Sequence, residues 1–274
     1  MLLLALLVAV STGPVAIPVA AHNVEAPADL PDASSADEII VTALKIPREK
    51  LPTGVYWSYQ SRLLSKIARE NAQMFYRCAL RSSAVKSIRI VVDGEPNNAK
   101  TRFAQGWIRE TNRGCYPPTG LAGNTGPSES NTILDAGRSV LDRGVIVETV
   151  LKTYVPDAAL TPTITSDPAV QSRFKQREGF RNRLRLPVDR DALILATCLV
   201  REQPVLATRL FHAEPGSLLE RGLIQTIIVE GRGCIGDASR VTVDPSFMRV
   251  YIMDAFYRWV VAARGVESLI PAAA

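Results

Sequence analysis

Two glutamates are the residues of this chain that could most readily perform acid–base chemistry. Glu95 and Glu214 each stand directly before a proline in similar surroundings, and paired carboxylates are the groups that glycoside hydrolases use. Each glutamate also falls at the predicted start of a helix, where a carboxylate stabilises the helix dipole. We therefore keep two interpretations, a structural role and a cell-wall hydrolase that uses Glu95 or Glu214 as its acid or base.

Two further patterns are compatible with catalysis or cofactor binding but have simpler explanations. The chain has only two histidines, and His212, at the end of a predicted short helix, is the one that could pair with a nucleophile. Residues 231–236 spell GxGxxG, but no helix is predicted after them, as a dinucleotide-binding turn requires. We interpret this motif as a glycine-rich helix end. The sequence predicts no catalytic set, no cofactor and no metal ligand.

The four cysteines form two pairs that the sequence relates to each other, because the same motif surrounds both. We expect the disulfides Cys78–Cys115 and Cys198–Cys234, which are typical of oxidising compartments. Each bridge would close a loop of 37 or 36 residues, which contributes about 3–4 kcal/mol in the chain-entropy model. Four buried free thiols are the alternative, and a zinc site is disfavoured because the chain lacks CxxC.

The surroundings of the cysteines repeat with an offset of 120 residues, which becomes 119 from the Glu-Pro step to the second cysteine of each motif. We therefore predict an all-α protein of two tandem homologous modules, residues 53–160 and 161–266, with about four helices and one disulfide each. The recurring arginines have either a structural or a ligand-binding role. They are Arg81, Arg89, Arg102 and Arg113, matched by Arg201, Arg209, Arg221 and Arg232.

Apolar spacing and capping residues predict the helices of both modules. Asp189 is the expected N-cap of one helix. Asp244 is the expected N-cap of the last helix, where Pro245 takes a position whose missing N–H costs nothing. A segment rich in Gly, Pro, Ser and Asn, residues 117–131, is interpreted as a surface loop inserted in the first module. The predicted helices are 55–82, 84–92, 97–112, 139–154, 189–202, 204–213, 217–230 and a last one from 245.

The N-terminal residues indicate export. An apolar run and a small-residue cleavage site predict a signal peptide over residues 1–21, with cleavage after Ala21, and a buried N-terminal helix is the alternative. We expect an acidic flexible linker over residues 22–52, a flexible tail over residues 267–274, and a periplasmic or secreted protein. No later apolar run is long enough to predict a membrane-spanning helix.

Within the predicted linker, residues 37–43 read Asp-Glu-Ile-Ile-Val-Thr-Ala. They resemble the short segment near the N-terminus of TonB-dependent outer-membrane receptors, which pairs as an added strand with the energising partner. The rest of the chain lacks the alternating strands of a barrel. The resemblance implies strand addition to a partner, and a linker strand without a partner is the alternative.

Charge points to an anionic partner. The net charge is +5 although residues 22–44 contain acidic and no basic side chains, so the remainder is distinctly basic. A basic surface attracts lipid headgroups, anionic polymers or acidic proteins, whereas export disfavours nucleic acid. The densest positive charge has no counterpart in the first module. This cluster lies either on a face that is solvated or used in packing, or on a face that binds a partner. Its members are Arg173, Lys175, Arg177, Arg181, Arg183 and Arg185.

The acidic linker, the cysteine-framed helices and the Cys-x2-Arg motif together resemble exported helical proteins of alphaproteobacteria that have no assigned activity. That resemblance implies the fold and export but no reaction. Our preferred hypothesis is an exported, non-enzymatic binding or scaffold protein whose basic face takes an anionic component of the cell envelope.

Overall fold

Helices make up most of the chain that the computed structural model describes, as the sequence predicted. The predicted signal peptide, most of the predicted linker and the predicted inserted loop lie outside the described residues. All described residues belong to one compact unit, residues 34–274. The described residues are 39–44, 59–116, 139–235 and 239–271.

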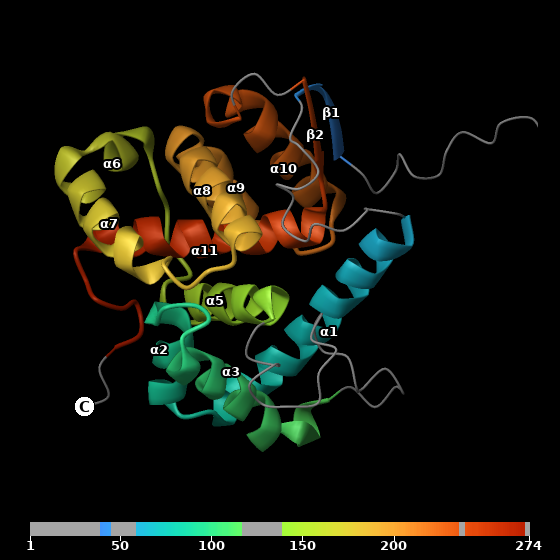
Figure 1. The fold of residues 1–274 in the computed structure, drawn as a ribbon, viewed down its shortest axis with the longest axis vertical. Coiled ribbons are helices and arrows are strands. Elements are labelled where there is room, and N and C mark those ends of the chain that lie inside the picture. Colours follow the sequence, from blue (N-terminus) through green and yellow to red (C-terminus); the bar gives the residue numbers. More distant parts are fainter. Residues whose placement is uncertain (1–38, 45–58, 117–138, 236–238, 272–274) are drawn as a thin grey trace, which may run out of the picture. The chain divides into compact units, whose positions relative to one another are not determined.

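Four helices follow one another in the same order in the described parts of residues 53–160, which we call the first half, and of residues 161–266, the second half, in which two further helices come first (Figure 1). A long helix, a short helix and a 13-residue helix lead into a 3-10 turn, and another long helix follows. The first half contains α1 (Tyr59–Ser82), α2 (Val85–Asp93), α3 (Ala99–Thr111), the turn Arg113–Cys115 and α5 (Val140–Tyr154). The second contains α8 (Pro187–Glu202), α9 (Pro204–His212), α10 (Leu218–Glu230), the turn Arg232–Cys234 and α11 (Pro245–Arg264).

Capping residues explain where the helices begin. Asp244 accepts hydrogen bonds from the backbone N–H groups after Pro245, so the predicted start of α11 is confirmed. The predicted cap at Asp189 is wrong, because α8 starts at Pro187 and Leu186 is its N-cap. Asp189 instead lies in the first turn of α8, where it pairs with Arg185.

Two helices that the sequence did not predict precede α8 in the second half. They are α6 (Pro162–Ser166) and α7 (Pro168–Arg181). The Asp167 side chain accepts from the backbone N–H groups of Ala169 and Val170 and so starts α7. Only Val170 and Phe174 of α7 are buried, which is too sparse a pattern to predict a helix from apolar spacing.

Two short strands accompany the helices. Strand β1 (Ile39–Leu44) pairs antiparallel with β2 (Ser239–Val243), and Ile39 lies opposite Val243. Residues 39–43 of the segment that resembles the strand of TonB-dependent receptors thus belong to a strand paired within its own chain. Pairing with another protein stays a prediction.

Both predicted disulfides are confirmed. Cys78 of α1 is bonded to Cys115, and Cys198 of α8 to Cys234, with Cα–Cα distances of 5.7 Å in each. Gly231, three residues before Cys234, is favoured as a glycine because a Cβ there would lie 2.8 Å from the backbone carbonyl oxygen of Ile227. Gly231 follows the end of α10. The described residues of the GxGxxG motif, 231–235, therefore follow a helix end, as predicted, and the element directly before them is the helix α10.

Helices α5 and α11 pack against each other and carry much of the core (Figure 1). Their backbones approach closely at one point, where a Cβ on Gly144 would lie 2.3 Å from the Cβ of Val250. Helix α1 packs on α5, and α8 and α7 pack on α11. None of the described helices has the length and hydropathy that a bilayer crossing requires.

Candidate functional site

Two arginines connect α5 and α11 reciprocally. Arg249 of α11 donates to Glu148 of α5, with Nε–Oε2 and Nη2–Oε1 distances of 3.1 and 2.7 Å. Arg143 of α5 reaches Asp254 of α11, with Nε 3.8 Å from Oδ2. The pairs are matched in the sequence. The loop inserted after Cys115 reduces the repeat offset from 119 to 106 residues, and Arg143 and Arg249, like Glu148 and Asp254, lie 106 residues apart. Each helix therefore supplies one arginine and one carboxylate to the other.

The same two arginines satisfy carbonyls at helix ends. Arg143 donates to the carbonyl of Val91 and, at 3.1 Å, to that of Val92 in α2. Arg249 donates at 3.0 Å to the carbonyl of Ala213, directly after α9. Because the last carbonyls of a helix have no partner within it, these guanidinium groups fix α2 and α9 to the α5–α11 pair.

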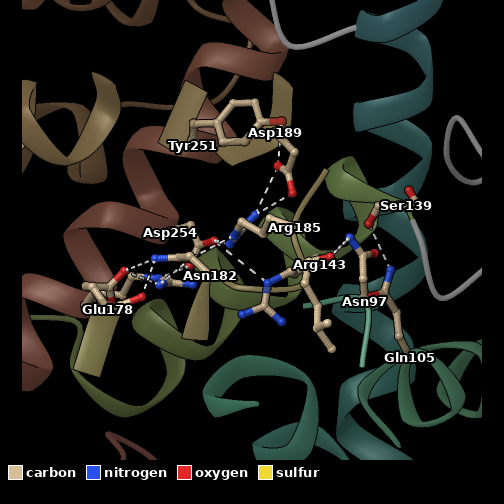
Figure 2. Close-up of polar contacts among 12 residues, drawn as sticks. Asn97, Gln105, Ser139, Arg143, Glu178, Asn182, Arg185, Asp189, Tyr251 and Asp254 are labelled. Carbon is tan, nitrogen blue, oxygen red and sulfur yellow. Dashed lines mark hydrogen bonds and ion pairs between the residues drawn. The ribbon is translucent and has the colours of Figure 1, made fainter. Parts of the chain in front are cut away.

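Asp254 is the centre of the larger cluster in Figure 2. It accepts from Arg185 Nη2 at 2.6 Å and from Arg258 Nε at 2.9 Å, and Arg143 points toward it. Burial pushes the pKa of Asp254 upward, but the three arginines outweigh burial and hold the pKa well below its ordinary value. Buried carboxylates need such partners. The cluster therefore fastens α5, α11 and the segment before α8 to one another.

Glu148 has the matched place in α5 but a more open setting. Burial raises its pKa, yet Arg249 and Lys152 outweigh burial and lower the pKa to about 2. Lys152 Nζ lies 2.9 Å from the carboxylate, and the lysine side chain is 45% exposed. Nearby, Arg69 of α1 forms a buried pair with Glu220 of α10. These charges are paired, so we assign the network to holding the helices.

One buried carboxyl lacks comparable compensation. Asp142 lies in the first turn of α5, and its side chain is buried near Tyr76. Burial raises the pKa of Asp142 to about 7, and Arg109 offsets this only in part. The matched residue in α11, 106 positions later, is Met248. The two crossing helices therefore differ in this titratable group.

The first part of the predicted basic stretch, residues 173–181, lies in α7. Two arginines of this part attach α7 to the C-terminal end of α11. Arg173 Nε and Arg177 Nη1 donate to the carbonyls of Ala262 and Val266, each at 2.7 Å. Ala262 lies in the last turn of α11, and Val266 follows the C-cap of that helix, Gly265. These two of the six predicted partner-binding residues therefore serve packing within the chain.

The residues after α7 join the two halves. Arg183 donates two hydrogen bonds to Glu95, at 2.5 and 3.2 Å, although its own side chain remains 55% exposed. Arg185 is 6% exposed and pairs with Asp189 and Asp254. The expectation that Arg185 belongs to an exposed basic face is therefore wrong, because the guanidinium is buried in the core network.

The last two of the six predicted cations differ from each other. Arg181 is partly buried, and burial together with nearby Arg258 lowers its pKa. Lys175 is exposed, and within the described part of the chain no hydrogen bond or ion pair engages it. Lys175 is thus the predicted cation that is best placed for an external anion.

A pocket lies between α7, α8 and α11, with a volume of about 290 Å³. Phe174 and Trp259 line it as a stacked pair, with ring centroids 4.2 Å apart and an interplanar angle of 15°. The indole Nε1 donates at 3.2 Å to the carbonyl of Thr197, so its polar atom is satisfied within the protein. Leu193 and the exposed Ile194 of α8 add aliphatic lining. The pocket is therefore largely apolar.

Positive charge borders this apolar lining. Lys175 of α7 and Arg201 of α8 both line the pocket. Arg201 Nη2 lies 2.8 Å from Glu202, but both side chains are almost half exposed, and such surface pairs are weak. The pocket carboxylate Glu178 is paired with Arg258. An anion at this pocket would meet two cations and one carboxylate that is already compensated.

The residues considered for catalysis lie elsewhere. Both oxygens of Glu95 accept hydrogen bonds from Arg183. Glu214 is exposed in the turn before α10, and His212 is exposed at the end of α9. Within the described residues, no three His, Cys, Asp or Glu side chains are grouped so that they could hold a metal ion.

The pocket could not be found from any one motif. Phe174 falls within the basic stretch, and Trp259 belongs to the apolar face expected for α11, so each has a simpler explanation in sequence. The sequence did contain a signal for the ion pairs between α5 and α11, because three charged residues recur in the two helices with the same spacing. They are Arg143, Glu148 and Lys152 in α5 and Arg249, Asp254 and Arg258 in α11.

Comparison of the chain with protein-family models, with curated proteins and with solved structures finds no match.

Proposed function

We propose that this chain is an exported, non-enzymatic binding protein for an anionic component of the cell envelope. The observation that carries the proposal is the placement of Lys175 and Arg201 on two different helices at the same pocket. Two cations that converge on one concavity attract an anion more strongly than isolated surface cations do. Binding there needs no catalytic group.

Export is supported by the two disulfides, which are typical of oxidising compartments. The apolar N-terminal run and the small residues before His22 favour the same conclusion. We therefore place the protein in the periplasm or outside the cell.

We further infer that the two halves are tandem homologous modules related by a pseudo-twofold arrangement. Support comes from the matched disulfides and from the reciprocal pairs Arg143–Asp254 and Arg249–Glu148. In this proposal the matched residues form a rigid frame. The unmatched α7 then completes the pocket by adding Lys175 and Phe174 to the lining from α8 and α11.

Anion binding can be tested with short-chain polyphosphate, a soluble anion without an apolar part. The double variant Lys175→Gln/Arg201→Gln should bind it roughly tenfold more weakly than the wild type, which corresponds to about 1.4 kcal/mol. Affinity of the wild type should also fall as salt is raised, because exposed charges are screened. Titration calorimetry at low and moderate salt measures both effects.

A matched control separates a site from overall charge. Lys86→Gln/Arg81→Gln removes the same two charges from exposed positions of the first half, and Arg81 is the counterpart of Arg201. This control should bind polyphosphate nearly as well as the wild type. Equal losses in the two double variants would overturn the proposal, because binding would then follow net charge alone.

A further inference from the structure

We infer that the occupant of the pocket is a single-chain anionic amphiphile, whose alkyl chain enters the pocket while its headgroup stays beside Lys175 and Arg201. This inference rests on the proposed function and specifies its ligand class. It concerns the apolar lining, which anion binding alone does not require.

The lining is suited to an alkyl chain. Phe174 is buried and Trp259 is 2% exposed, and both nevertheless line the pocket with Leu193. Ile194 of the same lining is 59% exposed, so its side chain is open to a ligand. Covering it with an alkyl chain removes apolar surface from water, which is favourable in proportion to the area covered.

Charge complementarity selects an amphiphile over a neutral apolar ligand. Lys175 and Arg201 are exposed, whereas Glu178 is held by Arg258. A carboxylate, sulfate or phosphate headgroup would meet the two exposed cations, while the chain meets the aromatic pair. A cationic amphiphile would bring like charges together at the rim.

Size selects one chain over two. Pockets for drug-sized ligands span roughly 300–1,000 Å³, and this pocket has about 290 Å³. A single short chain fits such a volume, whereas the paired chains of a membrane phospholipid do not. The pocket is also bordered by three helices, so it is a concave site rather than a flat membrane-facing surface.

A series of alkyl sulfates tests this inference with one headgroup throughout. Inorganic sulfate, butyl, hexyl and octyl sulfate are titrated into the full-length wild-type protein, each below its micelle concentration. Affinity should rise roughly threefold to fourfold with each added methylene until the pocket is filled. Octyltrimethylammonium, with the same chain and the opposite charge, should bind at least roughly tenfold more weakly than octyl sulfate.

Two matched variants assign the chain-length effect to the pocket. Ile194→Gln should flatten the series, because it replaces apolar lining with an amide. Val205→Gln changes a similarly exposed apolar residue of α9 that does not line the pocket, and it should leave the series unchanged. Both positions are more than half exposed, so neither change should unfold the protein.

Different failures have different meanings. If polyphosphate binds at Lys175 and Arg201 but octyl sulfate binds no better than inorganic sulfate, the amphiphile inference is overturned and the proposed function stands. If neither anion depends on Lys175, both are overturned. If only phosphatidylglycerol vesicles bind, and Ile194→Gln has no effect on them, the ligand is a membrane surface and the pocket assignment is wrong.

Discussion

The two carboxylates where α5 and α11 meet have matched positions but different surroundings. Glu148 is compensated by Arg249 and by Lys152, whose side chain is 45% exposed. Asp254 is compensated by Arg258 and Arg185, whose side chains are each 2% exposed. The difference arises because the first half has no described equivalent of Arg185, which follows α7.

This comparison separates two kinds of residue. Residues that recur in both halves, such as Arg143 and Arg249, bond to helix-end carbonyls and to the opposite helix. Residues that occur in one half only include Lys175 and Phe174, which line the pocket. Matched residues such as these hold the fold. The added helix α7 completes the pocket at which we place binding, together with Arg201 of the matched helix α8.

The largest expected effect comes from breaking one of the reciprocal pairs. Arg249→Leu leaves Glu148 with only an exposed lysine, and removing one partner of a buried pair costs about 3–5 kcal/mol. Arg143→Leu should cost less, because Asp254 keeps Arg185 and Arg258. Urea denaturation of both variants measures the two losses. Equal losses of stability in the two variants, or a larger loss for Arg143→Leu, would contradict the claim that Asp254 is better compensated than Glu148.

A smaller effect is expected where the helix backbones meet. Gly144→Val places side-chain atoms against Val250, and overpacking of this kind typically costs about 1–3 kcal/mol. Because Gly144 and Val250 are matched residues, adding Val250→Gly should restore part of the loss. Thermal unfolding of the single and double variants gives the comparison. A double variant less stable than Gly144→Val would argue against equivalent positions.

The pH dependence of stability should reveal a difference between α5, which carries Asp142, and α11, which carries Met248 at the matched position. The pKa of Asp142 is raised to about 7 in the folded protein, whereas an unfolded aspartate titrates near roughly 3.9. Its stabilising contribution is therefore present below about pH 4 and is lost as pH rises through about 7. Asp142→Asn removes this dependence, so the variant should gain about 2–4 kcal/mol relative to the wild type between pH 4 and 8.

Denaturation at several pH values measures this gain. Asp191→Asn, which changes an exposed carboxyl of α8, is the control and should follow the wild-type profile. A constant difference between Asp142→Asn and the wild type across this range would show that Asp142 does not titrate there. The matched Met248 predicts no corresponding effect in α11.

Much of the helical fold could be predicted from sequence, because its signals are local. Asp244 and Pro245 mark the start of α11, and the repeated cysteine motif indicates both disulfides. Helix α7 could not be predicted, since its arginines interrupt the apolar pattern and donate to carbonyls in and just after α11. Side-chain charge alone does not reveal such internal acceptors.

The candidate site was predictable only in part. The basic stretch drew attention to Lys175, but the same reasoning included Arg185, which the fold buries. The pocket brings together Phe174, Ile194 and Trp259 from three helices. Contact between residues so far apart along the chain depends on helix packing, which local periodicity does not determine.

A crystal structure of the protein grown with octyl sulfate would test the central claim most directly. We predict an alkyl chain between α7, α8 and α11 against Trp259, with the sulfate near Lys175 and Arg201. A structure in which this pocket is empty and sulfate is bound in the first half instead, for example at Arg81, would contradict the claim that the pocket carries binding.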